Sequence, residues 1–273
     1  MSESNRHTRK THHIIYIKKN NRRHTSAHTQ MSHFDFKQFR IYHDRCAMKV
    51  GTDGILLGAW ANLQGAKKVL DIGCGSGLIA LMAAQRCNAQ VTGIEIDPQS
   101  ATQAQENCTA SPFADRINVI SADIRKFRPE EKFDCLLSNP PYFEQTLLPP
   151  DPRRATARHT DGLSFAELLQ EARRLMSPEG CFQIIIPYDA AGRFCEAASQ
   201  QDMYPTRRTD VATRAGKAPK RTLLCLAAGQ TAFPIRHDNL TLCNADGSRS
   251  REFTQLTQDF YLDISESRKV YNQ

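Results

Sequence analysis

The stretch KVLDIGCGSGL, residues 68–78, decides the fold, because an apolar run ends there in a turn with glycine at alternate positions. Gly73, Gly75 and Gly77 allow the backbone to turn tightly and to approach a ligand without Cβ clashes. Dinucleotide-binding folds use G-x-G-x-x-G at such a turn, and a phosphate-binding P-loop adds a lysine, whereas the pattern here is D-x-G-x-G-x-G. The leading Asp71 suits a ligand with a cationic amino-acid end better than a pyrophosphate.

On both sides of this stretch, apolar strands alternate with amphipathic helices from Phe34 onward. Strands are expected at residues 68–71, 90–96, 117–121, 133–138, 181–187 and 221–228, and helices at 78–87, 98–109 and 163–176. Ser177–Gly180 is expected to be a turn that closes the last of these helices. The alternation predicts one α/β domain over residues 34–262, with a doubly wound sheet covered by helices.

Acidic residues follow the next two predicted strands. Glu95 ends the second strand and is placed to accept both hydroxyls of a ribose, and Asp123 follows the third and can accept from an adenine amino group. Taken alone, each acid could instead cap a helix N-terminus, which is the role we expect for Asp97. The ordered set, a glycine turn followed by an acid after strand two and another after strand three, predicts an S-adenosylmethionine site.

The four residues Asn139-Pro140-Pro141-Tyr142 follow the fourth predicted strand, where an open α/β sheet places its active crevice. The prolines fix φ and remove N–H donors, so the Pro140 carbonyl is rigidly aimed. This carbonyl and the Asn139 side chain can accept the two hydrogens of an exocyclic amine, while Tyr142 offers a face for a flat base. The motif predicts methyl transfer to a planar nitrogen; the alternative is a plain turn between strand and helix.

These motifs resemble the class I methyltransferases that carry N-P-P-[YF], and more narrowly the bacterial tRNA1(Val) adenine-N6-methyltransferase family. The narrow resemblance covers residues 36–262 and is carried by FKQF at 36–39, HDRCAMKVGTDGILLGAW at 43–60, AQEN at 104–107, RINV at 116–119, ADI at 122–124 and LTQDFYL at 256–262.

The resemblance implies a Rossmann-like class I fold with a mostly parallel seven-stranded sheet, S-adenosylmethionine as cofactor, and tRNA as partner. The methyl group is expected on N6 of the adenosine at position 37, next to the anticodon, in the anticodon stem-loop. The resemblance also implies that Lys49, Thr52 and Asp53 belong to a lid over the methionine end of the cofactor. In the alternative reading, Gly51–Gly54 is simply a turn with a helix cap.

The positive charge of the chain is unevenly distributed. The net charge is +7, but residues 1–30 hold seven Lys or Arg against one Glu, so the remainder is close to neutral. We expect residues 1–33 to be a disordered extension, either without a fixed role or tethering RNA, and 263–273 to be a tail. Two further clusters either contact phosphate or are merely solvated: Arg153, Arg154, Arg158 and His159, and then Arg207, Arg208, Arg214, Lys217, Lys220 and Arg221 around an expected hairpin.

The remaining composition narrows the classes of protein. There is no apolar run of about 18 residues, which argues against a membrane protein, and no secretory signal is recognisable. None of the nine cysteines forms a C-x-x-C pair, so neither zinc nor a disulfide framework is indicated. We expect a cytoplasmic monomer without a metal site. Two alternative functions are a protein-glutamine N5-methyltransferase, whose amide nitrogen is also planar, and a catalytically silent RNA-binding scaffold.

Overall fold

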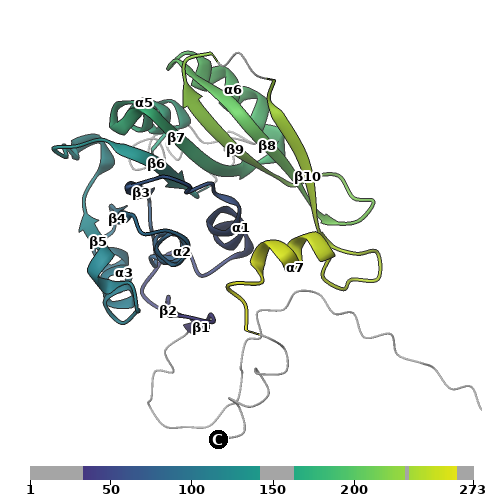
Figure 1. The fold of residues 1–273 in the computed structure, drawn as a ribbon, viewed down its shortest axis with the longest axis horizontal. Coiled ribbons are helices and arrows are strands. Elements are labelled where there is room, and N and C mark those ends of the chain that lie inside the picture. The colour runs from purple at the N-terminus through teal and green to yellow at the C-terminus, as the bar shows by residue number, and fades with distance from the viewer. Residues whose placement is uncertain (1–32, 142–162, 231–233, 263–273) are drawn as a thin grey trace, which may run out of the picture.

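A computed structural model describes residues 33–141, 163–230 and 234–262 of the chain (Figure 1). The expected tail at 263–273 and the expected N-terminal extension, apart from His33, lie outside these residues. So do Tyr142 and the basic cluster from Arg153 to His159.

The described strands form a two-stranded ribbon and an eight-stranded sheet. The ribbon pairs β1 (His33–Asp35) with β2 (Arg40–Tyr42). The strands of the large sheet are β3 (Lys68–Ile72), β4 (Gln90–Glu95), β5 (Ile117–Ser121), β6 (Phe133–Ser138), β7 (Met176–Pro187), β8 (Met203–Arg214), β9 (Arg221–Ala228) and β10 (Arg236–Cys243).

The order of the large sheet is β10-β8-β9-β7-β6-β3-β4-β5, and of the eight described strands in this sheet only β9 runs antiparallel to its neighbours. The mostly parallel, doubly wound sheet is therefore confirmed, and β8 and β9 form the expected hairpin. The expected number of seven strands is wrong, because β10 extends the edge by pairing parallel to β8. Only the second half of β10 is well buried, so its sequence RHDNLTLC lacks the apolar pattern that would have predicted it.

The expected turn at Ser177–Gly180 is also wrong, because these residues lie within β7. Met176 pairs with Phe133 and Cys181 pairs with Cys135, so four residues of β7 bulge opposite a single residue of β6. A Cβ on Gly180 would lie 2.8 Å from Met176 Cγ and 3.0 Å from the Phe133 carbonyl oxygen. Glycine fits this crowded bulge, which resembles a turn in the sequence alone.

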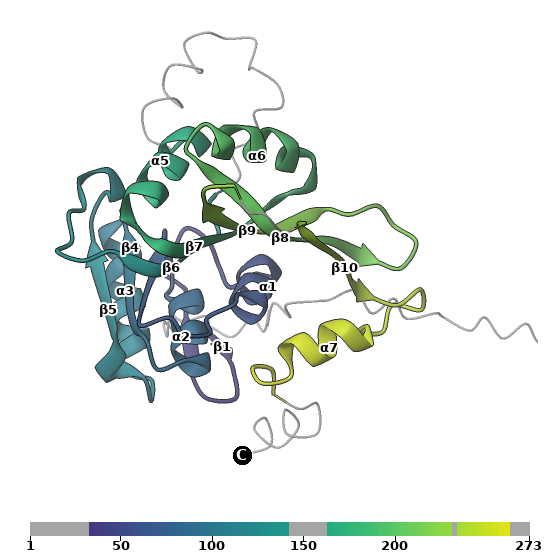
Figure 2. The same ribbon diagram turned by 45° about the horizontal axis from the view of Figure 1, so that its top comes forward.

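Helices cover both faces of the sheet, as Figure 2 shows. The α-helices are α1 (Thr52–Trp60), α2 (Leu78–Arg86), α3 (Pro98–Thr109), α5 (Phe165–Leu175), α6 (Ala191–Ser199) and α7 (Arg251–Thr257), and short 3-10 turns are η1 (Ala114–Arg116), η2 (Ile124–Lys126) and η3 (Tyr188–Ala190). One buried apolar cluster joins α1, α2 and α7 to the sheet, and a second joins α5 and α6 to the opposite face. The helices that begin near residues 78, 98 and 163 are confirmed.

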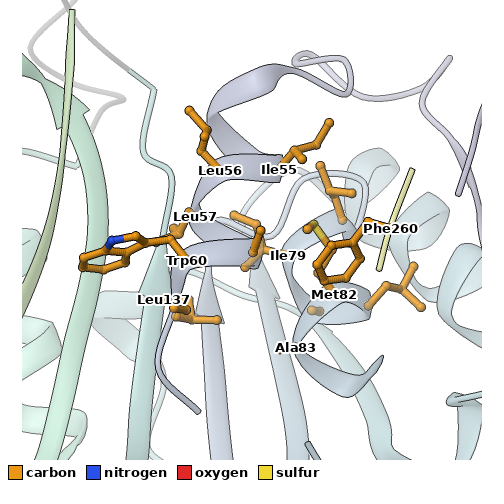
Figure 3. Packing of buried hydrophobic residues seen from close by; sticks show 14 of the residues in the cluster. Ile55, Leu56, Leu57, Trp60, Ile79, Met82, Ala83, Leu137 and Phe260 are labelled. Carbon is orange, nitrogen blue, oxygen red and sulfur yellow. The ribbon is translucent and has the colours of Figure 1, made fainter. Parts of the chain in front are cut away.

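The contact between α1 and α2 is close (Figure 3). Leu57 of α1 and Ile79 and Met82 of α2 are buried in the same cluster. A Cβ on Gly58 would lie 2.6 Å from Met82 Sδ, so the absence of a side chain at Gly58 permits this approach. Trp60 points toward the strands, where its Nε1 donates to Thr209 Oγ1 of β8 at 2.9 Å. Helix α1 is thus fixed to both α2 and the sheet.

No helix in the described ranges is long and apolar enough to cross a membrane.

Candidate active site

The predicted site residues meet at the edge of the sheet that is formed by the carboxyl ends of its parallel strands. Strands β3, β4, β5 and β6 are parallel neighbours, and the register pairs Ile72 with both Ile94 and Ser138. The glycine turn, Glu95, Asp123 and Asn139 therefore leave their strands at the same edge. This is the edge where open α/β sheets bind ligands.

The glycine turn is built from left-handed residues. Gly73, Gly75 and Gly77 have φ values of 70°, 53° and 82°. A Cβ on Gly73 or Gly75 would meet no heavy atom within 4 Å, so the space above these residues is open to a ligand. A Cβ on Gly77 would instead lie 3.2 Å from Cys108 Sγ, because α3 packs against it. The first two glycines therefore suit ligand approach, and the third suits helix packing.

Asp71 lies beneath this turn with its side chain completely buried. Its Oδ2 accepts the Ala80 N–H of α2 at 3.0 Å, while Oδ1 has no hydrogen-bond partner. Burial is the main cause that raises the pKa of Asp71 from 3.8 to about 7, and the nearby Glu95 raises it further. A buried carboxylate oxygen without a partner is costly unless a ligand or water supplies a donor.

Glu95 is fastened to the glycine turn. Its Oε2 accepts the Gly75 N–H at 2.9 Å and its Oε1 accepts the Asp97 N–H at 3.0 Å. Each carboxylate oxygen can accept a second hydrogen bond, so a sugar diol can still be held. Ile96, the next residue, is 57% exposed and offers an apolar surface beside Glu95 that the sequence motifs did not indicate. Asp97 caps α3 by accepting the Ser100 N–H at 2.9 Å, which confirms its expected role.

Asp123 has a neighbour that was not foreseen. Its carboxylate caps η2 by accepting the Arg125 N–H and also pairs with the Arg125 guanidinium, whose Nη2 lies 2.8 Å from Oδ2. This contact is the main cause that lowers the pKa of Asp123. Asp123 therefore acts as a helix cap, which is the alternative role considered for it. Its hydrogen bond with an adenine amino group stays a prediction, and this bond would use the acceptor positions of the carboxylate that Arg125 leaves free.

Asn139 and Pro140 are half-buried and Pro141 is exposed. The Ser138 hydroxyl donates to the Ile72 carbonyl at 2.9 Å, which joins the end of β6 to the start of the glycine turn. A Cβ on Gly54 would lie 3.9 Å from Asn139 Nδ2. Asn139 thus lies near both the glycine turn and the first turn of α1.

The segment assigned as a lid continues directly into α1. Gly51 is the N-cap residue, without a side-chain cap, and Thr52 begins the helix. Asp53 in the first turn accepts from Arg221 Nε of β9 at 2.8 Å. Lys49 is exposed. The structure thus brings Gly54, the residue after Asp53, close to Asn139, and one member of the predicted basic cluster, Arg221, forms an ion pair with Asp53.

Two side-chain amides of α3, Asn107 and Gln103, position the chain around the glycine turn, and neither was among the predicted site residues. Asn107 Nδ2 donates to the carbonyls of Tyr42 and Ser76 at 2.8 and 2.9 Å. Gln103 accepts the Arg45 N–H at 3.0 Å and donates to Asp44. Asn107 thus joins the segment that precedes α1 to the glycine turn, and Gln103 fixes the same segment to α3. Both side chains are buried, and of the two only Asn107 belongs to the AQEN stretch at 104–107.

The donors and acceptors of this edge fit S-adenosylmethionine. The buried Asp71 oxygen without a partner matches an ammonium group, Glu95 matches a sugar diol, and the open Gly73 and Gly75 leave room beside both.

Comparison with known proteins agrees with this geometry. The chain matches the family model of the methyltransferase small domain over residues 50–191. It superposes on a predicted O-methyltransferase from Agrobacterium tumefaciens with a TM-score of 0.60, at 21% identity over 76% of this chain and 96% of that one. It also resembles a glycopeptide N-methyltransferase solved with S-adenosylmethionine, with a TM-score of 0.50 at 12% identity over 66% of this chain and 100% of that one. The fold and the family match define an S-adenosylmethionine-dependent methyltransferase of class I.

Curated relatives narrow the assignment. A Bacteroides fragilis protein named tRNA1(Val) (adenine(37)-N6)-methyltransferase is 47% identical over 84% of this chain and 97% of its own length. A Yersinia pestis protein of the same name is 44% identical over 84% of this chain and 93% of its own length. The chain belongs to the tRNA1(Val) (adenine(37)-N6)-methyltransferase family.

Proposed function

We propose that this enzyme transfers the methyl group of S-adenosylmethionine to N6 of adenosine 37 in tRNA1(Val). The observation that carries the proposal is the position of Asn139, which lies between the glycine turn after β3 and Gly54 of α1. The names of the relatives, which are 44–47% identical over most of their length, support the substrate.

The chain's own residues divide the cofactor between them in this proposal. The free oxygen of Asp71 receives the ammonium group, Glu95 accepts the two ribose hydroxyls, and Asp123 accepts from the adenine amino group. Gly73 and Gly75 leave room for the ligand, and Gly77 seats the turn against α3. Lys49, Thr52 and Asp53 cover the methionine end. When bound, S-adenosylmethionine supplies an electrophilic methyl group on a sulfonium.

The reacting amine is prepared by positioning. The Asn139 side-chain oxygen and the Pro140 carbonyl accept the two N6 hydrogens, which draws the nitrogen lone pair out of conjugation with the ring. Pro141 keeps the backbone rigid, and Tyr142 stacks on the base. After transfer the nitrogen is acidic and its proton leaves to water, so no strong base is needed. Preorganised acceptors of this kind act through orientation and electrostatics.

An anticodon-loop base suits this site because it is already unpaired. Turning such a base toward Asn139 costs less than extruding one from a duplex. We propose that the enzyme acts as a monomer in the cytoplasm on the anticodon stem-loop.

The test is to incubate the protein with methyl-labelled S-adenosylmethionine and an unmodified tRNA1(Val) transcript, and then to digest the RNA and identify the labelled nucleoside. A transcript with guanosine at position 37 is the matched control. The expected result is N6-methyladenosine from the first transcript alone. Label in both transcripts would refute the position. In a parallel reaction that contains a release factor, label in that protein but not in RNA would favour the protein-glutamine alternative. A chain that binds tRNA and transfers nothing would be the silent scaffold.

A further inference from the structure

The turn between β8 and β9 projects from the body of the molecule (Figure 2). Residues 203–221 contain six Lys or Arg and one Asp. We call the set Tyr188, Arg208, Arg214, Lys217 and Lys220 the hairpin surface. Arg221 is not included, because it pairs with Asp53.

Three cations of the hairpin surface are exposed at the turn. Arg214, Lys217 and Lys220 form no ion pair with a carboxylate of the described residues, although Asp246 lies close enough to Arg214 to feel its charge. The turn itself is ordered by backbone bonds, since the Lys217 N–H donates to the Arg214 carbonyl at 3.1 Å and the Lys220 N–H to the Val211 carbonyl at 2.8 Å. The cations thus extend from a defined support.

Arg208 is held in place by a buried acid. Asp210, only 5% exposed, accepts from Arg208 Nε at 2.9 Å and from Thr222 Oγ1 at 2.7 Å. His237 Nε2 lies 2.8 Å from the other oxygen of the same carboxylate. The guanidinium carbon of Arg208 lies 5.6 Å from the centre of the Tyr188 ring. An oriented guanidinium therefore flanks an aromatic ring.

Tyr188 is an aromatic side chain at the same edge of the sheet as Asn139, where the carboxyl ends of the parallel strands lie. It is 40% exposed and follows β7, which runs parallel to β6 and extends three residues beyond Ile184, the partner of Ser138. The Tyr188 N–H donates to the Lys220 carbonyl at 3.2 Å, so the ring and the turn cations are physically joined. Asp189, also exposed, is the acid beside it in sequence.

We infer that the hairpin surface binds the RNA strand that flanks the target adenosine. Tyr188 stacks on a neighbouring unpaired base, and Arg208, Arg214, Lys217 and Lys220 contact phosphates. An exposed ring among cations is the combination that holds single-stranded nucleic acid, because every base has a face to stack and every linkage carries a negative charge. This inference rests on the proposed function, since it takes RNA as the substrate.

The experiment measures the dissociation constant of unmodified tRNA1(Val) transcript as a function of salt. Lys217→Ala/Lys220→Ala is expected to reduce the slope of log affinity against log salt by about 1.5, because each phosphate contact contributes about 0.7–0.9. The matched control is Lys67→Ala/Lys132→Ala, which removes two exposed lysines that precede β3 and β6 at the opposite edge. The control should leave the slope unchanged.

The stacking role is tested with a second pair of variants. Tyr188→Ala is expected to raise the dissociation constant about 5-fold or more, as loss of one base–aromatic stack does. Tyr188→Phe keeps the ring and should restore the wild-type value. Affinity for S-adenosylmethionine, measured by calorimetry, should stay unchanged in all four variants.

The outcomes separate this inference from the proposed function. The wild type could methylate adenosine 37 while Lys217→Ala/Lys220→Ala keeps its salt slope and Tyr188→Ala keeps its dissociation constant for tRNA. The inference that the hairpin surface binds RNA would then be wrong, and the proposed function would stand. If Tyr188→Phe binds as weakly as Tyr188→Ala, the stacking role is wrong. If the wild type places no methyl group on tRNA, both proposals are overturned.

Discussion

Asp71 carries an energetic cost in the cofactor-free protein that a single substitution should remove. Its carboxyl is fully buried, and its pKa rises from 3.8 to about 7, mainly through burial. Because the folded state favours the protonated form, the folded protein binds more protons than the unfolded chain between about pH 4 and pH 7. Its stability therefore falls as the pH rises through this window. Asp71→Asn removes the charge and keeps an oxygen for the Ala80 N–H.

The size of the effect follows from the pKa change. A difference of about three pH units, at about 1.4 kcal/mol per unit, corresponds to about 4 kcal/mol above pH 7. Relaxation and water entry reduce such penalties, so we expect Asp71→Asn to raise the free energy of unfolding at pH 8 by about 2–4 kcal/mol. The gain should shrink as the pH falls toward 5, because the wild-type carboxyl then becomes protonated.

Urea unfolding of the cofactor-free protein at pH 5 and pH 8 measures this directly. Asp134→Asn is the matched control, because Asp134 accepts the N–H groups of Lys67 and Lys68 at 2.8 and 3.0 Å and should gain nothing from losing its charge. Saturating S-adenosylmethionine should stabilise the wild type more than Asp71→Asn, since the stability that a ligand adds grows with the logarithm of its concentration relative to its dissociation constant. A variant no more stable than wild type at pH 8, or a gain independent of pH, would refute the reasoning.

Three further substitutions separate the roles of the site. Asn139→Ala should lower kcat about 100-fold or more, because the Asn139 side-chain oxygen acts on the amine of the substrate, while the affinity for S-adenosylmethionine stays nearly intact. Single-turnover assays and calorimetry measure the two quantities, and an equal loss of both would contradict this role. Glu95→Ala should raise the dissociation constant of the cofactor about 10- to 100-fold, as loss of charge-assisted hydrogen bonds does, and a normal calorimetric affinity would count against the ribose assignment. Gly77→Ala should lower the free energy of unfolding by about 1–3 kcal/mol in urea, because φ is 82° and Cys108 crowds the new Cβ; an unchanged midpoint would show that the turn relaxes.

The sequence was sufficient to predict that the candidate site residues lie together. Parallel strands bring their carboxyl ends to one edge, so an order of motifs along the chain becomes an arrangement in space once the strands are recognised. Glu95 ends a strand, the glycine turn, Asp123 and Asn139 each follow one, and the structure places all four at that edge. This inference required no side-chain geometry, which is why it succeeded.

Side-chain partners could not be predicted in the same way. Arg125 stands two residues from Asp123, but whether it turns back onto the carboxylate depends on rotamers and neighbours. Asp53 and Arg221 are 168 residues apart and meet only because β9 runs antiparallel beside β7. The second half of the sheet was predicted less well than the first, because β10 and the β7 bulge carry polar residues that break the apolar pattern.

Helix α1 shows how the longest stretch of family resemblance should be interpreted. Residues 54–60 are all buried, so most of that stretch is constrained by packing against α2 and the sheet and says little about a ligand. Its first turn is different, because Asp53 pairs with Arg221 of the hairpin strand and Gly54 faces Asn139. At the other end, Trp60 is bonded to Thr209 of β8. Helix α1 is therefore buried and fixed at both ends, and its first turn lies between Asn139 and the β8–β9 hairpin. Within α1, only this first turn bears on the proposal that Lys49–Asp53 cover the cofactor.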